Sequence, residues 1–356
     1  MGKRIAVMGA GAVGGYVGGH LAQLGQDVTL IDPWPEHVEA IRARGLELDG
    51  ISPEDRVTVR AAKTMHLTEA QGLAKQKPID IAFVSMKSYD TEWATMFIRP
   101  YLAPDGYVVS LQNCMNEERI AGIVGWGKTV GMIAATISVD LYEAGRIRRT
   151  VPRGGAKNTT FRIGEVHGRI TKRVEELAAM VAAIDSVKAT DNLWGERWSK
   201  LCLNGMRNGV SAATGLGGND CDRRDKTRRF MIQLGGEAVR VGQALGYELE
   251  EILKIRPETL ARASEGDKAA MEEAESILLA RVGSNAPGAR SDLQRPSMGQ
   301  DMLKGRRTEI DYINGFIEQK AKEVGLKAPA HVALTEAVKR VERGEIPARP
   351  ENVENL

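Results

Sequence analysis

The feature that most constrains this chain is a glycine motif directly after its first apolar run. Residues 5–8 are Ile-Ala-Val-Met, and Gly9-Ala10-Gly11-Ala12-Val13-Gly14 follows in the pattern GxGxxG. In this pattern the first glycine permits a tight turn, the second lets the backbone approach a pyrophosphate, and the third lets a helix pack on the strand. The motif therefore predicts a strand, a phosphate-binding turn and a helix whose N-terminus faces the phosphates.

An acidic residue follows at the spacing that a dinucleotide site requires. The apolar run 28–31 ends at Asp32, 18 residues after Gly14, where a carboxylate can accept hydrogen bonds from an adenosine ribose. A carboxylate there would also repel a 2′-phosphate, and residues 33–37 offer no strong cation. We therefore expect a nicotinamide dinucleotide, with NAD favoured over NADP. The alternative, that Asp32 only starts the turn before Pro33, stays open.

The pattern of apolar runs changes near residue 190. Before that point, short runs at 5–8, 28–31, 81–84, 107–109 and 130–138 alternate with amphipathic stretches, which is typical of a buried parallel sheet with crossover helices. Two further predictions are a hairpin at the sheet edge, formed by 146–151 and 159–166, and a helix over 174–184 followed by a strand from Val187.

From residue 191 the spacing is helical, with no convincing strand. The fold class predicted is thus α/β: a Rossmann-type doubly wound sheet over 1–190, followed by an all-helical domain over 191–356. The last residues, from Glu345, are rich in Pro, Glu and Asn and are expected to form a loose terminus.

Two polar residues close apolar runs where ligands of such sheets bind. Lys87 follows 81–86 and Asn113 follows 107–112, and the carboxyl ends of parallel strands border the ligand crevice. Lys87 is therefore a candidate contact for the cofactor, and Asn113 for the nicotinamide ribose or the substrate. For each residue alone, an ordinary polar loop position is the alternative.

One helix of the second domain carries an unusual polar face. Residues 194–208 have a helical pattern, and Lys200, Asn204 and Asn208 recur at i, i+4 and i+8 on one side. Asparagine is a modest helix former, so propensity does not explain the pair. A solvated stripe is the alternative, but amides fix ligand orientation better than they solubilise a surface. A lysine among them could protonate a ketone oxygen as hydride arrives.

Ser297 and Glu309 each lie in a sequence pattern typical of the start of a helix. Ser297 and Gln300 have the spacing of a capping box, which predicts that Ser297 is an N-cap. Glu309 lies where an acid favours the helix dipole. On these patterns alone, capping is the default interpretation of Ser297, and Glu309 is interpreted as a helix-terminus acid.

Composition excludes several function classes. Lys and Arg total 49 and Asp and Glu 47, giving a net charge of +2, and only 5% of residues are aromatic. We therefore expect no nucleic-acid partner. The three scattered cysteines and five unpaired histidines predict neither a disulfide framework nor a metal site. The N-terminal apolar run is too short for a signal peptide, and no run could span a bilayer, so we expect a cytoplasmic protein with no membrane partner.

Together these motifs resemble the ketopantoate reductases (2-dehydropantoate 2-reductases), in the right order along nearly the whole chain. The most specific stretch is Thr308-Glu309-Ile310-Asp311-Tyr312-Ile313-Asn314-Gly315. The other matching segments are Gly9–Gly14, Gln112-Asn113, Trp198-Ser199-Lys200-Leu201 with Asn204 and Asn208, and Ser297-Met298.

The resemblance implies hydride transfer between a nicotinamide cofactor and a 2-keto or 2-hydroxy acid, bound between a Rossmann and a helical domain. It makes Lys200 the general acid and Glu309 the acid that binds and orients substrate. Asn204, Asn208 and Ser297 become substrate-binding groups, with Asn113 near nicotinamide and substrate and Lys87 on the cofactor. Under the resemblance, Ser297 and Glu309 thus acquire a functional role besides capping.

Two departures from the family leave the substrate open. Asp32 stands where NADPH-dependent members have a basic residue nearby, and residues 248–295 form a longer charged stretch that could enlarge the pocket, form a lid or make a dimer contact. The alternatives are an NAD-dependent D-2-hydroxy acid dehydrogenase acting on a bulkier or aromatic substrate, and a non-catalytic dinucleotide-sensing protein. A homodimer through the helical domain is a further expectation.

Overall fold

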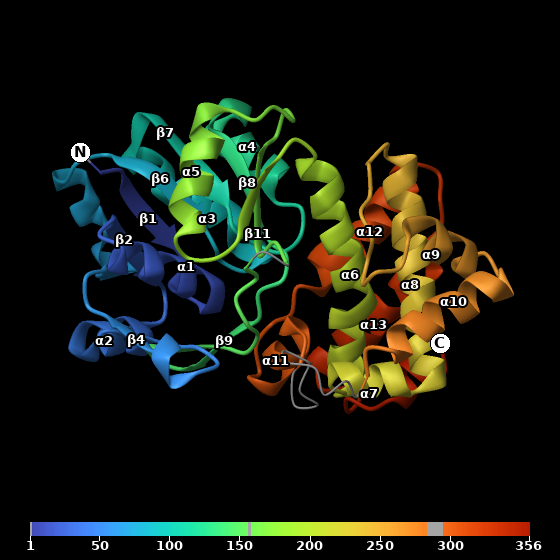
Figure 1. The fold of residues 1–356 in the computed structure, drawn as a ribbon. Helices are drawn as coiled ribbons and strands as arrows, with labels where there is room; N and C mark the ends of the chain where they lie inside the picture. The colour runs from blue at the N-terminus through green and yellow to red at the C-terminus, as the bar shows by residue number, and fades with distance from the viewer. Residues whose placement is uncertain (1, 156–157, 283–294) are drawn as a thin grey trace. The chain divides into compact units, whose positions relative to one another are not determined.

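The computed structural model describes residues 2–155, 158–282 and 295–356, and it divides into two compact units, Met1–Leu193 and Trp194–Leu356 (Figure 1). The first unit holds all the strands of both sheets, and the second is helical in its described part. The fold class predicted from the sequence is thus confirmed.

An eight-stranded sheet forms the centre of the first unit, in the order β12-β11-β8-β7-β6-β1-β2-β5. Neighbouring strands are parallel except β8 and β11. Its strands are β1 (Arg4–Met8), β2 (Asp27–Asp32), β5 (Lys63–His66), β6 (Ile79–Val84), β7 (Leu102–Ser110), β8 (Thr129–Ala134), β11 (Phe161–Glu165) and β12 (Val187–Thr190). All of these except β5 lie on runs that the sequence predicted.

Alternation along β1 shows why helices cover both faces of the sheet. Ile5 and Val7 join a buried core that includes side chains of α1 (Ala12–Gln23) and α5 (Lys172–Ala182). Ala6 and Met8 join a second core with α3 (Thr91–Ile98) and α4 (Glu117–Val124). Successive side chains of a strand point to opposite faces, so the sheet is doubly wound.

A second, four-stranded sheet of order β4-β3-β10-β9 packs beside α1, and it corrects the hairpin prediction. Its strands are β3 (Leu46–Asp49), β4 (Val57–Val59), β9 (Val139–Glu143) and β10 (Arg146–Arg149). β10 pairs with β9 and β3, whereas β11 pairs with β8 and β12, so 146–151 and 159–166 do not form a hairpin. The turn that forms one is at Gly145, whose φ of +76° suits glycine. β3 and β4 follow α2 (Pro35–Arg44).

The second unit is built around the long helix α6 (Leu193–Thr214). Gly205 and Gly209 allow close packing: a Cβ on Gly205 would lie 3.0 Å from Ile317 Cδ1, and one on Gly209 would lie 2.9 Å from Leu334 Cδ2. These contacts seat α6 against α12 and α13. The other helices are α7 (Gly218–Arg223), α8 (Asp225–Ala244), α9 (Pro257–Ser264), α10 (Lys268–Leu279), α11 (Ser297–Leu303), α12 (Ile310–Glu323), α13 (Pro329–Glu342) and α14 (Glu351–Glu354).

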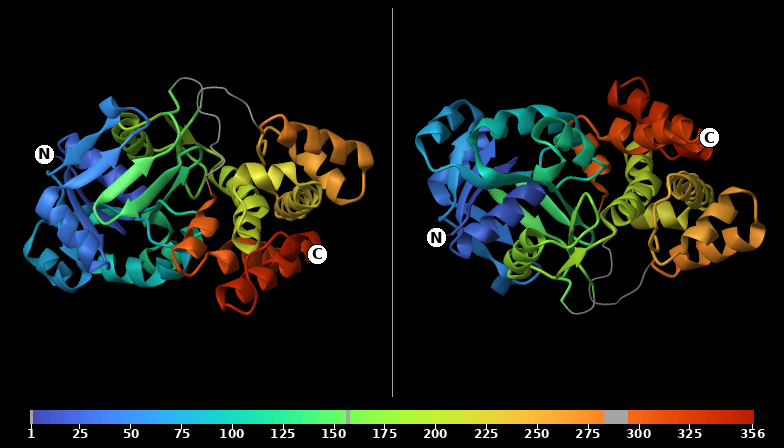
Figure 2. Two further views of the ribbon diagram at one scale, coloured as in Figure 1. Left: turned by 90° about the horizontal axis from the view of Figure 1, so that it is seen from below. Right: turned by 90° about the horizontal axis from the view of Figure 1, so that it is seen from above.

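The charged stretch 248–295 is only partly described. Its helices α9 and α10 pack on one another and on α8, as both views of Figure 2 show. Residues 283–294 lie outside the described residues, and the roles suggested for the stretch, including a dimer contact, stay predictions.

The C-terminal tail is not the loose terminus that its composition suggested. Val353 of α14 is buried, and Asn352 Nδ2 donates to the carbonyl of Ala213 at 2.9 Å. Arg224 pairs with Glu354 at 2.6 Å. The tail therefore docks on the helical unit through one apolar residue and specific polar contacts, which composition does not reveal.

Within the described residues no helix is long and apolar enough to cross a membrane. All three cysteines are buried and unbridged.

Candidate active site

The glycine motif folds as a turn at the crossover point of the sheet. β1 pairs with β2 on one side and β6 on the other, so the turn after β1 lies where the strand order reverses. Gly9 has a φ of +95°, and a Cβ there would lie 3.0 Å from the backbone nitrogen of Met86. A Cβ on Gly14 would lie 2.1 Å from the carbonyl oxygen of Gly9. The first and third glycines are thus required by the fold itself.

The second glycine of the motif has a different surrounding. A Cβ on Gly11 would meet nothing within 4 Å, and Gly11 is the N-cap of α1 with no side chain to cover the helix end. The next residues, Ala12 and Val13, begin the helix, and the first N–H groups of a helix have no partner within it. Open space over these groups fits a pyrophosphate.

Asp32 holds the glycine turn in place. Its side chain is buried, and its two oxygens accept from the backbone N–H of Ala10 at 2.8 Å and of Trp34 at 2.9 Å. The bond to Trp34 shows that Asp32 does shape the turn around Pro33, the alternative considered from the sequence. The contact of Asp32 with an adenosine ribose stays a prediction.

His37 is a residue of this region that the sequence analysis missed. It is fully buried on α2, where Nε2 lies 2.9 Å from the carbonyl oxygen of Ala10 and Nδ1 accepts from the N–H of Gly145 at 2.8 Å. These bonds place the proton on Nε2 and brace the glycine turn from the second sheet. No local signal marks it, because both partners are distant in sequence.

The two strand-end candidates lie on adjacent loops. Lys87 is half-buried and precedes a short 3₁₀ helix after β6, and Asn113 is half-buried in the loop after β7. Gln112 Nε2 donates to the carbonyl of Met86 at 2.8 Å, which joins the loops directly. Ser85 Oγ donates to the carbonyl of Gly9 at 2.8 Å. The glycine turn, the Lys87 position and the Asn113 position therefore share one edge of the sheet.

In the helical unit, the polar face of α6 is not a solvated stripe. Asn204 and Asn208 are each only 6% exposed, and Lys200 is half-buried. Amides on a solvated face would be exposed, so the burial of Asn204 and Asn208 contradicts the alternative of a solvated stripe. Burial also lowers the pKa of the Lys200 ammonium to about 8, because desolvation penalises the charged form. A lysine with that pKa exchanges protons near neutral pH.

Ser297 joins this face, and the capping interpretation is wrong. α11 begins at Ser297 with Pro296 as its N-cap, no side chain caps it, and Gln300 Nε2 donates to the carbonyl of Arg295 instead. Ser297 Oγ accepts from Asn208 Nδ2 at 3.2 Å. Two residues 89 positions apart, both predicted to bind substrate, are thus in contact.

Glu309 occupies the N-cap position of α12, but its side chain makes no capping bond. It is 1% exposed. The cap is made by Thr308, whose Oγ1 accepts from the N–H of Ile310 at 3.3 Å. Glu309 thus lies at the helix start, as the sequence predicted, but its side chain does not cap the helix.

A buried polar cluster, Asn314 with His331, fixes α12 behind the polar face. Asn314 Nδ2 donates to the carbonyl of Gly205 at 3.0 Å and lies 3.0 Å from His331 Nδ1. His331 Nε2 lies 2.9 Å from the carbonyl of Leu234. Burial lowers the pKa of His331 to about 4, so the ring is neutral at ordinary pH.

One buried ion pair anchors α6 to α7 and was also missed from the sequence. Arg207 forks onto Asp222, with both N–O distances 2.9 Å. Its partner lies 15 residues away across a turn, a separation without helical spacing.

Among the described residues, no group of His, Cys, Asp or Glu could hold a metal ion.

Comparison with known proteins places the chain in one family. The family model "Ketopantoate reductase PanE/ApbA" matches residues 5–165, and "Ketopantoate reductase PanE/ApbA C terminal" matches residues 192–342. A 2-dehydropantoate 2-reductase of Pyrococcus horikoshii is 28% identical over 341 residues, covering 95% of this chain and 97% of that protein.

Comparison with solved structures finds the same family and the same fold. A PanE/ApbA family ketopantoate reductase from Ralstonia eutropha JMP134 is 28% identical with a TM-score of 0.74, covering 96% of this chain and 99% of that one. A D-mandelate dehydrogenase solved with NADH and anilino(oxo)acetate shares the fold, with 23% identity, a TM-score of 0.76, and coverage of 96% and 98%. The chain belongs to the ketopantoate reductase family, and it is accordingly a nicotinamide-dependent oxidoreductase of the 2-dehydropantoate 2-reductase type.

Proposed function

We propose that this enzyme reduces a 2-keto acid to the 2-hydroxy acid with Lys200 as the proton donor, and that NADH is its preferred cofactor. The observation that carries the proposal is the α6 face. There a half-buried lysine of lowered pKa shares one helix side with two buried asparagines, of which Asn208 contacts Ser297. Such a face supplies one proton and several neutral hydrogen-bonding groups.

The roles follow from the chemistry of each group. Reduced nicotinamide, when bound, supplies the hydride. Lys200 Nζ donates its proton to the ketone oxygen, and its positive charge stabilises the alkoxide character that develops there. The amides of Asn204 and Asn208 and the hydroxyl of Ser297 orient the keto acid without adding charge. Glu309, buried and without a capping bond, accepts a hydrogen bond from a hydroxyl group of the substrate.

The cofactor preference rests on Asp32. Its carboxylate is fixed by two backbone bonds, so it cannot easily turn away from an additional phosphate. Charge repulsion therefore disfavours a 2′-phosphate, while a carboxylate at this position suits ribose hydroxyls. We propose Gly9, Gly11, Ala12, Val13 and Gly14 as the pyrophosphate turn, with Lys87 and Asn113 as further cofactor contacts.

The test is a matrix of two cofactors and several keto acids. Purified protein is mixed with NADH or NADPH and with 2-dehydropantoate, pyruvate or phenylglyoxylate, and the loss of nicotinamide absorbance is followed. Turnover of 2-dehydropantoate supports the proposed function, and preference for phenylglyoxylate would favour the aromatic-acid dehydrogenase. Dinucleotide binding without turnover of any acid would favour the sensing protein.

Lys200→Ala isolates the proposed acid. We expect kcat to fall by roughly 10²–10⁴, the range of general acid catalysis, while NADH affinity changes little. Ser199→Ala is the neighbouring control, because Ser199 Oγ bonds to the carbonyl of Gly195 and the N–H of Glu250, not to the proposed substrate groups. Full activity of the Lys200 variant would show that another group donates the proton.

A further inference from the structure

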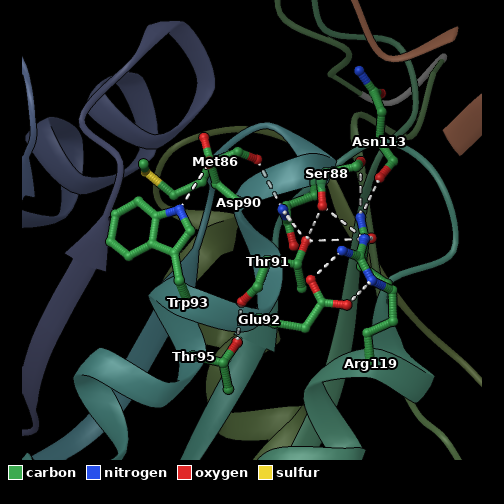
Figure 3. Close-up of polar contacts among 11 residues, drawn as sticks. Met86, Ser88, Asp90, Thr91, Glu92, Trp93, Thr95, Asn113 and Arg119 are labelled. Carbon is green, nitrogen blue, oxygen red and sulfur yellow. Dashed lines mark hydrogen bonds and ion pairs between the residues drawn. The ribbon is translucent and has the colours of Figure 1, made fainter. Parts of the chain in front are cut away.

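A polar network lies beneath the two loops that carry the proposed cofactor contacts (Figure 3). We name residues 85–90 the Lys87 loop and residues 111–116 the Asn113 loop. The loops follow neighbouring parallel strands, since Val84 of β6 pairs with Ser110 of β7. Strand pairing fixes where the loops begin, but the side chains beyond the strands must fix their separation.

Arg119 of α4 is the central group of this network. Its NH1 donates to the carbonyl of Ser88 at 2.6 Å and to Asn116 Oδ1 at 2.7 Å. One guanidinium thus binds the backbone of the Lys87 loop and a side chain of the Asn113 loop. These partners lie 31 and 3 residues away in sequence.

Asn116 completes the bridge between the loops. Its Nδ2 donates to the carbonyl of Asn113 at 2.9 Å and to Ser88 Oγ at 3.1 Å. Asn116 and Ser88 are almost fully buried, so no water competes for these bonds. Figure 3 shows the side chain of Asn113 pointing away from the network, and the bond from Asn116 holds Asn113 through its backbone carbonyl.

Glu92 of α3 orients the guanidinium. Arg119 Nε donates to Glu92 Oε1 at 2.6 Å, and NH2 pairs with the other carboxylate oxygen. Burial alone would raise the pKa of the Glu92 carboxyl, but the Arg119 bonds hold it below its usual value. A fork on a carboxylate fixes the guanidinium plane, so NH1 is aimed at the two loops.

We infer that Arg119 is a positioning residue for dinucleotide binding, which acts by holding the Lys87 loop and the Asn113 loop at a fixed separation. The inference rests on the proposed function, because it takes Lys87 and Asn113 as cofactor contacts. Arg119 itself need not touch the cofactor. Replacing its planar fork by a lysine keeps the charge but cannot satisfy Glu92, Ser88 and Asn116 together.

The test compares Arg119→Lys with a matched variant elsewhere in the same unit. Arg173 of α5 also forks onto a carboxylate, with Nε 2.7 Å from Glu165 Oε1, and donates to a backbone carbonyl, that of Gly127, at 2.7 Å. Gly127 precedes β8, and Glu165 ends β11, which runs antiparallel to β8. Arg173 and its partners therefore lie at the amino end of β8, whereas the Lys87 loop and the Asn113 loop follow the carboxyl ends of β6 and β7. Arg173→Lys removes an equivalent interaction without touching either loop.

We expect the dissociation constant of NADH, measured by its fluorescence on binding, to rise about tenfold in Arg119→Lys. It should stay within about twofold of wild type in Arg173→Lys. Backbone amides of the two loops should exchange hydrogen faster only in the Arg119 variant. The KM for NADH should rise more than kcat falls, because the loops bind cofactor and Lys200 delivers the proton.

Two outcomes would each overturn one of the two proposals, and a second variant covers a failure of the first to fold. Unchanged NADH affinity and unchanged loop exchange in Arg119→Lys would overturn the inference while leaving the proposed function intact. Absence of NADH and NADPH binding by the wild-type protein would overturn the proposed function itself. Should the Arg119 variant fail to fold, Glu92→Gln carries the test: it leaves the Ser88 and Asn116 bonds in place and should weaken NADH binding by a smaller factor, about threefold.

Discussion

At the scale of the residue, the chemistry depends on Lys200 holding a proton at neutral pH and releasing it readily. Desolvation lowers its pKa to about 8, which leaves the ammonium form dominant at pH 7. With a much lower pKa, Lys200 would be deprotonated at pH 7 and could not donate a proton. With the ordinary value near 10.4, its proton would be harder to transfer. The buried amides on the same face suit this state because they carry no charge that would stabilise the ammonium further.

The pH dependence follows with a definite sign. Reduction needs the protonated lysine, so kcat/KM for keto-acid reduction should be level below pH 8 and fall about tenfold per unit above it. Oxidation of the hydroxy acid needs the neutral amine and should rise over the same range. Initial rates in both directions across pH check this, and parallel profiles would argue against a single shared acid–base group.

Asp32 combines a structural and a recognition role, and Asp32→Asn separates them. The amide keeps one acceptor oxygen but loses the negative charge, so we expect the preference for NADH over NADPH to shrink by about tenfold. Loss of one backbone acceptor should cost about 1 kcal/mol of unfolding free energy. Cofactor dissociation constants and chemical denaturation measure the two effects. An unchanged cofactor ratio would place ribose recognition elsewhere.

At the scale of the element, the glycine turn shows which parts of a motif the fold requires and which a ligand requires. We expect Gly14→Ala to lose about 2 kcal/mol or more of stability, because its Cβ would overlap the carbonyl of Gly9 at 2.1 Å. Gly11→Ala meets open space and should change stability by less than about 1 kcal/mol. It should nevertheless weaken NADH binding about tenfold, because a methyl group blocks the pyrophosphate approach. Thermal unfolding and NADH titration of both variants check the contrast, and equal effects on stability would contradict it.

The elements that sequence predicted best were those with strong periodicity. The buried strands of the main sheet and the helix α6 follow directly from apolar spacing. The second sheet does not, because β3, β4 and β10 are three or four residues long and their pairing depends on α1 and on a turn at Gly145. Sequence spacing predicts a cap at Ser297, whereas its bond to Asn208 depends on how α11 packs on α6.

At the scale of the whole molecule, sequence spacing and the family resemblance propose the residues of the candidate site, but they do not show the contacts that hold those residues in place. Lys200, Asn204 and Asn208 share a helix, so their alignment is a property of the sequence. Arg119 binds the carbonyl of Ser88, 31 residues away, and the ring of His331 contacts the carbonyl of Leu234, 97 residues away, so local sequence does not reveal these contacts. The docked tail is a similar case, since its one buried residue, Val353, has no local pattern.

His331 makes the stability of the molecule depend on pH. Its folded pKa is about 4, against 6.5 when exposed, so the unfolded chain binds a proton that the folded one excludes. The stability contributed by the neutral ring is therefore present above pH 6.5 and lost as pH falls toward 4, by about 3 kcal/mol in all. Denaturant unfolding of wild type and His331→Gln across this range isolates the effect from the carboxylates, which titrate in both proteins. The variant should be less stable at pH 7 and show a shallower decline. Parallel curves would mean that the ring takes up a proton over the same pH range in the folded and the unfolded protein, and that the bond from Asn314 to Nδ1 does not fix its neutral form.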